Sequence, residues 1–214
     1  KTPLAIISSQ MEMIPLIGDE KKRQEYCGSV VEEVNRMNQM LHSMLTIFSA
    51  EQGIEDMAME EVNVSRIAAK ELEDFGSLFA RRKLILSAEI QEERKAWGNG
   101  ELLRRAVDNY LMNASRHTVS GGSVQVSLSQ EGEKLRFSVY NDGEKISLKD
   151  QRKIWDSFYQ GSVLDGKSQG EGTGLGLYIV KSVVAQHDGR CGVENREKGV
   201  EFWFEIPVTP EGRK

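Results

Sequence analysis

The sequence predicts an α+β protein: a helical hairpin that forms a four-helix bundle when two copies associate, followed by a sandwich in which helices cover one face of a mixed β-sheet. Three observations lead to this prediction. Residues 1 to about 50 carry only helical spacing of apolar residues, including a heptad stripe too wide for one hairpin to bury. From about residue 54 onward, helical stretches and strand-like alternation coexist. They do not follow the regular strand–helix order of a parallel sheet, which favours an α+β layer.

The composition is that of a globular protein with one or two domains. Of its 214 residues, 39% are hydrophobic and 29% are charged. The net charge of -5 and the lack of a basic run argue against nucleic acid as a partner. No apolar stretch approaches the ~20 residues of a membrane span, so we expect no membrane contact by this fragment. Cys27 and Cys191 are too few for a disulfide framework or metal site, which favours a cytoplasmic setting.

The first predicted element is the helical hairpin. Its two helices are separated by Pro15–Asp19, where proline and glycine break the pattern. We expect two copies to pair through the hairpin into a homodimer, with packing of the hairpin on the second region as the alternative. Apolar residues spaced by three and four form the stripe: Leu4, Ile7, Met11 and Ile14, then Cys27, Val30, Val34, Met37, Leu41, Met44 and Phe48.

The pattern changes after Gly53, which predicts domains at 1–53 and 54–214. Residues 54–62 are typical of a polar linker that enters a strand. Asn63 or Ser65 can then cap a helix. The apolar face of that helix is Ala68, Leu72, Phe75 and Phe79, and a half-buried strand with Leu84, Leu86, Ala88 and Ile90 follows.

The remaining elements alternate between helix and strand. A helix is predicted from about Glu101 to His117, and a hairpin of two strands turns at Glu131–Glu133. A glycine-rich segment and its helix come next. Strands at 189–194 and 200–206 close the chain.

Four glycines stand at alternate positions in residues 170–177, directly before the helical pattern of 178–185. Such a backbone can wrap a polyanion with its N–H groups, and the following helix adds its N-terminal dipole. The segment lacks the Gly-Lys-Ser/Thr end of a P-loop and does not follow a strand at Rossmann distance. A flexible surface loop is the alternative interpretation.

A second polar pattern lies on the helix before it. Asn109 and Asn113 sit four residues apart on one helical face, and Arg116 and His117 follow one turn later. Amide oxygens suit Mg²⁺, and a guanidinium can pair with phosphate oxygens. A polar, solvated helix face is the alternative.

These motifs together resemble those of sensor histidine kinases. Residues 109–118 resemble their N box, 139–146 their first glycine box, 154–159 their F box and 172–177 their second glycine box. Lys1-Thr2-Pro3-Leu4 resembles the tail of the phosphoacceptor motif His-Glu-Leu-Lys-Thr-Pro-Leu. All five occur in family order and cover nearly the whole chain.

The resemblance implies a Bergerat-type (GHKL) ATP-binding fold carried on a dimerisation and phosphotransfer hairpin. It implies transfer of the γ-phosphoryl group from Mg-ATP to a histidine, and then to an aspartate of a response-regulator receiver domain. It also implies a membrane-bound parent sensor. ATP and Mg²⁺ are the expected cofactors.

The resemblance also assigns roles to individual residues. Asn113 would bind the Mg²⁺, with Asn109 and Arg116 on the phosphate side, and His117 would contact ribose or phosphate. Residues 161–172 would form a lid over the nucleotide. The other expected nucleotide-site residues are Asn141, Gly143, Ile146, Phe158, Gly172, Thr173, Gly174, Leu175, Gly176 and Leu177; Phe158 would also couple the lid to the hairpin.

Two departures from the family pattern stand out. Asn141 occupies the position where many members have the Asp that accepts a hydrogen bond from adenine, and an amide oxygen accepts it without charge assistance. Asp142 is adjacent but should point elsewhere. The phosphoacceptor histidine would lie three residues before Lys1, so we expect this fragment to bind ATP and dimerise without phosphorylating itself. Thr2 would then orient the water of a phosphatase reaction, or be a frayed helix end.

Two other functions are consistent with parts of the pattern. One is a catalytically inactive, ATP-gated dimeric interaction module. The other is a Bergerat ATPase of the chaperone or mismatch-repair type, which the heptad hairpin directly before the ATP-binding region disfavours.

Overall fold

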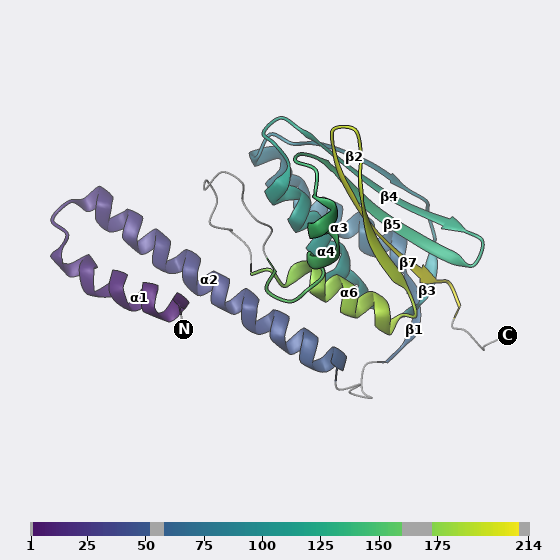
Figure 1. The fold of residues 1–214 in the computed structure, drawn as a ribbon, viewed down its shortest axis with the longest axis horizontal. Helices are drawn as coiled ribbons and strands as arrows, with labels where there is room; N and C mark the ends of the chain where they lie inside the picture. The colour runs from purple at the N-terminus through teal and green to yellow at the C-terminus, as the bar shows by residue number, and fades with distance from the viewer. Residues whose placement is uncertain (1, 52–57, 160–172, 210–214) are drawn as a thin grey trace. The chain divides into compact units, whose positions relative to one another are not determined.

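The computed structural model describes residues 2–51, 58–159 and 173–209 (Figure 1). The chain divides into two units, Lys1–Thr46 and Ile47–Lys214. The domain boundary expected from the sequence at Gly53 lies outside the described residues.

The first unit is the helical hairpin. Helix α1 (Thr2–Met13) continues into a short 3₁₀ helix, η1 (Ile14–Leu16), and α2 spans Glu20–Glu51. The side chain of Asp19 accepts hydrogen bonds from the backbone N–H groups of residues 21 and 22, at 2.9 and 3.2 Å, and so caps the start of α2.

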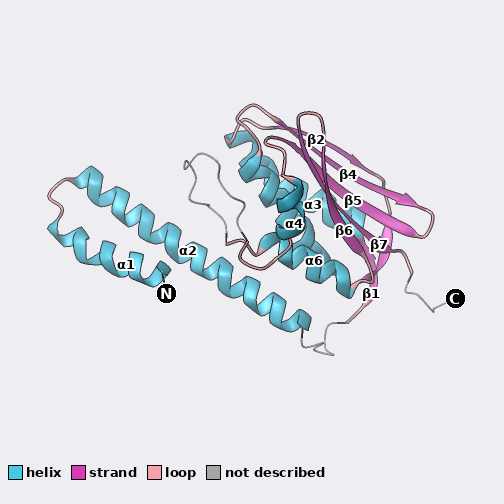
Figure 2. Cartoon of the chain, in the orientation of Figure 1, coloured by secondary structure: helices cyan, strands magenta, loops and turns pink. Residues whose placement is uncertain are grey.

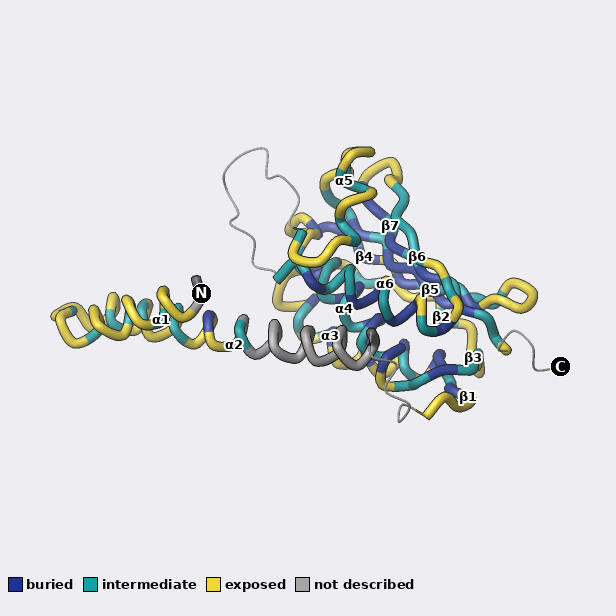
Figure 3. The backbone as a smooth tube through the Cα atoms, turned by 60° about the horizontal axis from the view of Figure 1, so that its bottom comes forward, coloured by how far each residue is buried: buried dark blue, intermediate teal, exposed yellow. Residues whose placement is uncertain are grey.

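Over residues 4–34, where most side chains are described, the hairpin buries little of its apolar stripe. Figure 3 shows mostly exposed and half-buried backbone along α1 and the first half of α2. Leu4 and Met11 are more than half exposed, at 58% and 54%, although both belong to the stripe. The two helices are joined by a polar contact, in which Gln10 Nε2 donates to Ser29 Oγ at 2.8 Å.

The second unit contains a five-stranded mixed sheet with the strand order β2-β4-β5-β7-β6, and a two-stranded sheet of β1 and β3. Strands β2 and β4 are parallel, and the other neighbouring pairs are antiparallel. The strands are β1 (Glu60–Asn63), β2 (Ile85–Ile90), β3 (Lys95–Gly98), β4 (Ser123–Glu131), β5 (Lys134–Asp142), β6 (Arg190–Asn195) and β7 (Gly199–Pro207).

Helices cover one face of the five-stranded sheet, as Figures 1 and 2 show. The inward side chains of the helices and of the strands pack together in one core. Within it, the rings of the strand residues Phe137 and Phe204 lie 5.3 Å apart between centroids. The fold class predicted from the sequence is therefore confirmed. The helices of this unit are α3 (Val64–Arg81), α4 (Gly100–His117), α5 (Leu148–Lys153) and α6 (Gly176–Gln186).

Local sequence signals account for most of these elements. The Asn63 side chain caps α3 by accepting from Arg66 N at 3.0 Å, whereas Ser65 bonds to the loop before β3. Ala88 is exposed, because β2 is an edge strand, so the expected half-buried alternation is only partly correct there. The sequence analysis did not anticipate β3 or α5.

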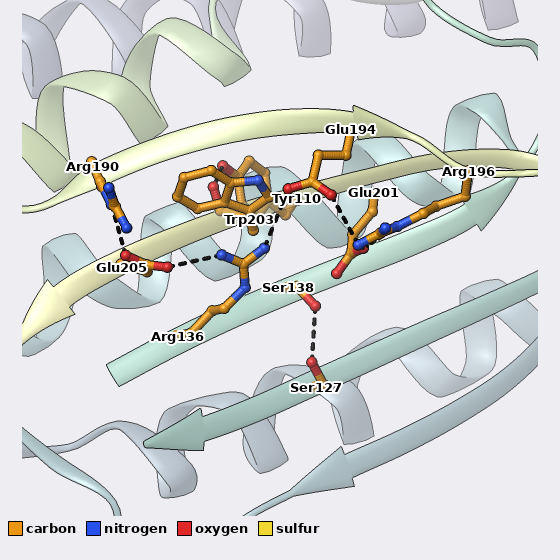
Figure 4. Close-up of polar contacts among 10 residues, drawn as sticks. All are labelled: Tyr110, Ser127, Arg136, Ser138, Arg190, Glu194, Arg196, Glu201, Trp203 and Glu205. Atoms are coloured by element: carbon orange, nitrogen blue, oxygen red, sulfur yellow. Dashed lines mark hydrogen bonds and ion pairs between the residues drawn. The ribbon is translucent and has the colours of Figure 1, made fainter. Parts of the chain in front are cut away.

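The other face of the sheet carries a chain of alternating charges (Figure 4). The network runs from Arg190 to Glu205, on to Arg136 and Glu194, and then to Arg196 and Glu201. The Arg136 guanidinium also lies 4.3 Å from the Trp203 ring centroid. Ion pairs and a cation–π contact therefore occupy the β5–β7–β6 part of the side opposite the helices.

Candidate functional site

Helix α4 carries the first part of the candidate site. Asn99 caps it by accepting from Leu102 N at 3.0 Å. Its core-facing residues, including Leu103, Tyr110 and Ala114, are buried. Asn109 and Asn113 are half-buried, so both lie at the margin of the core, where a ligand can reach them.

The Asn109 side chain joins α4 to the start of α6. Its Nδ2 donates to Arg105 O at 2.7 Å, one turn back on the same helix. Its Oδ1 faces Gly176, where an added Cβ would lie only 2.8 Å away. The structure thus brings the N-box helix and the second glycine box together, and Gly176 permits the close approach.

The N-terminus of α6 differs from those of α3, α4 and α5, each of which has a side-chain cap. Leu175 stands at its N-cap position and makes no side-chain cap hydrogen bond. The hydroxyl of Thr173 instead accepts from the N–H of Leu175 itself, at 3.3 Å. The N-cap residue therefore gives the start of α6 no side-chain cap beside Asn109, which suits an anion site.

One turn beyond Asn109, the side chain of Asn113 makes no hydrogen bond to any other residue that the structure describes. A half-buried amide with an uncommitted oxygen is a suitable ligand for Mg²⁺, a hard cation that prefers oxygen. The chemistry of this residue therefore fits the metal that the sequence analysis assigns to it.

The last turn of α4 lies against the first glycine box. An added Cβ at Gly143 would lie 2.8 Å from the His117 carbonyl oxygen, so only glycine fits at this position without a shift of the backbone. The pKa of the His117 imidazole is lowered by desolvation and by the charges of Arg116 and Arg82. At neutral pH the ring is thus a neutral donor or acceptor.

The neighbours Asn141 and Asp142 point to opposite faces of β5. Asn141 is buried on the helix side, and its Nδ2 donates to Asp142 O at 3.3 Å. On the other side, the Asp142 carboxylate accepts from Tyr140 Oη at 2.6 Å and from Ser123 N at 2.8 Å. The two bonds lower the pKa of Asp142, whereas desolvation, together with the bond to Asp142, raises the pKa of Tyr140 to about 12. The expectation that Asp142 points elsewhere is confirmed.

The F box touches the second glycine box through the backbone. Gly174 has a φ of +68°, and an added Cβ there would lie 2.7 Å from the Phe158 carbonyl carbon. Phe158 itself has a φ of +62°, and its ring is about half exposed. Any residue but glycine at position 174 would both strain the backbone and push Phe158 away.

The structure places the other expected residues as follows. Leu175 is fully buried, and Leu177 is half-buried in the first turn of α6. Ile146 is held by Asn195, whose Oδ1 accepts from Ile146 N at 2.9 Å and whose Nδ2 donates to Ile146 O at 2.8 Å. Gly172, the lid at 161–172 and the side chain of Thr2 lie outside what the structure describes.

Sequence reasoning missed two residues that shape the first glycine box. One is Asn195, and the other is Gly199, whose added Cβ would lie 1.9 Å from the Asn141 carbonyl oxygen. They are the ends of the turn between β6 and β7, and an Asn-to-Gly turn between two strands is the signal that could have found them.

Two hollows lie elsewhere in the second unit. One, of about 560 Å³, lies on the helix-free face of the sheet and is lined by residues such as Ser127, Ser138 and Tyr140. The other, of about 360 Å³, lies where α3 and α4 end, at Arg82 and Thr118.

The fold and the site define an ATP-binding domain of the Bergerat class, and comparison with known proteins agrees. Residues 98–210 match the family described as "Histidine kinase-, DNA gyrase B-, and HSP90-like ATPase". The chain belongs to this family, and within it to the sensor histidine kinases.

Individual relatives support this assignment. The chain is 28% identical over 210 residues to the sensor protein VanSB of Enterococcus faecalis, which covers 98% of this chain and 47% of that protein. It is 30% identical to the solved catalytic domain of the histidine kinase ThkA, with a TM-score of 0.66 over 73% of this chain and 100% of that one. The chain spans less than half the length of the curated relatives it matches.

A third comparison extends the likeness in fold to almost the whole chain. The structure of ThkA in complex with the response regulator protein TrrA has a TM-score of 0.77 at 24% identity, covering 99% of this chain and 59% of that one. In the part of our chain that the structure describes, no helix is both long and apolar enough to cross a membrane.

Proposed function

We propose that this chain is the kinase core of a sensor histidine kinase. It would bind Mg-ATP and transfer the γ-phosphoryl group to a histidine of the phosphoacceptor motif whose tail Lys1–Leu4 resembles. The phosphoryl group would then pass to an aspartate of a response regulator. The observation that carries this proposal is the contact of the uncapped N-terminus of α6 with Asn109.

Residues along α4 would contact different parts of the nucleotide. Asn109 and His117 are eight residues apart, about 12 Å along the helix axis. The phosphate end would lie beside Asn109, Arg116 and the glycines at 174 and 176. The base end would lie near Asn141 and Gly143, where the backbone passes closest to His117.

Asn141 would recognise adenine as an acceptor. Its Nδ2 already donates to Asp142 O, which leaves Oδ1 for the exocyclic amino group of adenine. Guanine presents a carbonyl oxygen at that position and would leave two acceptors facing one another. Adenine specificity is thus expected without a carboxylate.

Asn113 would hold the Mg²⁺ ion together with the phosphates. When bound, the metal supplies positive charge that offsets the phosphate oxygens of the nucleotide. The contribution of the protein is orientation and exclusion of water: Leu175 is buried under the start of α6, and the Gly174–Phe158 contact fixes the glycine-rich backbone beside α4.

The hairpin would provide the dimer and the docking surface. Its exposed stripe residues, such as Leu4, Met11 and Val34, would be covered by a second copy. The ThkA–TrrA complex supports a response regulator as partner, and the relatives' names support a sensor protein as the parent, which would be membrane-bound. Thr2 would orient the water in a phosphatase reaction.

The test uses a chain that carries the residues His-Glu-Leu directly before Lys1, incubated with Mg²⁺ and γ-labelled ATP. Acid-labile, base-stable label is expected. Asn113→Ala should bind ATP at least tenfold more weakly and lose the label. The matched control is Gln125→Ala, which removes an exposed amide from the helix-free face of the sheet. This variant should keep both its affinity for ATP and the label.

Tight ATP binding without label would contradict the kinase and favour the ATP-gated interaction module. Steady hydrolysis of ATP without label would favour an ATPase. Equal binding of GTP and ATP would contradict the role given to Asn141.

A further inference from the structure

The turn after α3 and the turn after α4 lie side by side and enclose the hollow of about 360 Å³. The function proposed above uses neither turn. The last residue of α3 and the two residues after it are cations, and two hydroxyl residues of the second turn line the same hollow. The lining residues are Arg81, Arg82, Lys83, Leu84, Thr118 and Ser120, which we call the basic hollow.

The backbone holds the two turns together. Lys83 has a φ of +59°, a left-handed conformation that reverses the chain directly after α3. Ile85 N then donates to Gly122 O at 3.0 Å, which ties this turn to the one that follows α4. The second turn is closed by a hydrogen bond from Gly122 N to Val119 O at 2.8 Å, with Gly121 at a φ of +79°. The hollow is thus part of the folded framework.

The cations of the hollow differ from most of the arginines around them. Arg81, Arg82 and Lys83 are all exposed, and no ion pair joins them to a carboxylate within the described residues. By contrast, Arg104 pairs with two glutamates, and the arginines on the open face of the sheet are all paired.

Helix dipoles favour positive charge at this hollow. The C-termini of α3 and α4 attract cations, and Arg81 and Arg116 stand in their last turns. Arg82 is the C-cap residue of α3 and Lys83 follows it, so both also stand at the negative end of this helix. They add to a local excess of positive charge in a chain whose net charge is -5.

The hollow also offers neutral donors. Ser120 is exposed in the second turn, and its hydroxyl has no partner among the described residues. The hydroxyl of Thr118 is already used, because Oγ1 donates to Ala114 O. Three cations and a free hydroxyl around one concavity are the donors that a doubly charged phosphate group requires.

We propose that the basic hollow is a second anion site, separate from the nucleotide site, that binds a phosphate group of a small phosphorylated ligand or of a phospholipid headgroup. Binding would relieve the mutual repulsion of the three cations. The lining residue Thr118 directly follows His117, whose carbonyl oxygen lies close to the backbone of Gly143, so the bound anion would lie near the first glycine box.

The test follows the backbone amide signals of Ser120 and Gly121 by NMR while inorganic pyrophosphate is added to the full chain without Mg²⁺. These signals should shift, and the affinity should fall as salt is raised. Arg82→Gln/Lys83→Gln should weaken binding at least tenfold. The control Arg66→Gln/Lys70→Gln removes two exposed cations from α3 itself and should change the affinity for pyrophosphate less than twofold.

A second arm distinguishes the source of the phosphate. Phosphatidylcholine vesicles with and without phosphatidylglycerol are sedimented with each variant. Binding to the anionic vesicles that is lost only in Arg82→Gln/Lys83→Gln assigns the hollow to a headgroup. Binding of pyrophosphate alone, lost in the same variant, assigns it to a free phosphorylated ligand.

Two outcomes would overturn the proposal. One is equal binding of both probes by the two double variants. The other is pyrophosphate shifts confined to Gly174 and Gly176, which would place the anion in the nucleotide site. The Asn113→Ala variant should keep the shifts at Ser120 and Gly121, so a failure of the nucleotide proposal leaves this test readable.

Discussion

The hairpin and the ATP-binding unit use their apolar residues in opposite ways. In the second unit, large apolar side chains such as Phe79, Phe137 and Leu175 are removed from water within one chain. In the hairpin, stripe residues such as Leu4 and Met11 remain more than half exposed. The second unit therefore buries a hydrophobic core of its own, whereas these stripe residues of the hairpin stay in water unless another surface covers them.

The difference also separates the two units experimentally. All three tryptophans, Trp97, Trp155 and Trp203, lie in the second unit. Their fluorescence thus reports on that unit alone, while far-ultraviolet circular dichroism also reports on the hairpin helices.

The largest expected effect is in the core of the second unit. Phe137→Ala should lower its free energy of unfolding by about 3–5 kcal/mol, because the side chain is fully buried and leaves a cavity. Phe158→Ala, the matched control, removes a half-exposed ring and should cost about 0.5 kcal/mol or less. Urea unfolding followed by tryptophan fluorescence measures both, and equal losses would contradict the self-contained core.

A smaller effect is expected in the hairpin, and only on association. Met11→Glu places a charge in the exposed stripe and should raise the dimer dissociation constant at least tenfold, or about 1.4 kcal/mol. The urea midpoint seen by fluorescence should stay unchanged. Ser9→Glu adds the same charge to the opposite face of α1 and serves as the control in sedimentation equilibrium. A wild-type chain that is monomeric throughout would rule out the dimer.

The smallest effect concerns the joint between α4 and α6. The buried His187 ring places Nδ1 2.7 Å from Val183 O, and its Nε2 accepts from Asn99 N at 3.0 Å. The ring is thus neutral with its proton on Nδ1. Burial lowers its pKa, against smaller opposing effects of the Val183 bond and Asp188.

Because the folded pKa of His187 is below the unfolded one, the unfolded chain binds the proton first as the pH falls. The neutral ring therefore stabilises the second unit fully above about pH 6.5, and this stability is lost as the pH falls through the folded pKa. His187→Gln keeps an acceptor for Asn99 N and should make the urea midpoint less dependent on pH between pH 7 and 5. His117→Gln is the control, because it removes the other imidazole whose pKa is lowered. If the urea midpoint of His187→Gln changed with pH as steeply as that of the wild type, this assignment would be contradicted.

Sequence reasoning predicted the elements of this fold where periodicity and capping act locally. The heptad spacing marks α1 and α2, and Asn63 marks the start of α3. The exposure of Ala88 was not predictable, since only the strand order makes β2 an edge. The short β3 has no alternating pattern long enough to recognise, because it pairs only with β1 and the chain turns away after four residues.

The candidate site shows the same division. Spacing on one helix predicts that Asn109 and Asn113 share a face, and alternation predicts that Asn141 and Asp142 do not. No spacing rule predicts that Gly176 meets Asn109, because their contact depends on how α6 packs beside α4. The basic hollow was missed for this reason too: its two halves are nearly forty residues apart in sequence and meet through one backbone hydrogen bond.

The alternating network on the helix-free face of the sheet also bears on how the protein behaves at high concentration. Its three arginines and three glutamates cancel one another, so the network carries no net charge, and a guanidinium covers the Trp203 ring. A bare sheet face would be an adhesive surface for other copies and for unfolded chains. Here ion pairs and a cation–π contact occupy the surface, so we expect this face to contribute little to association.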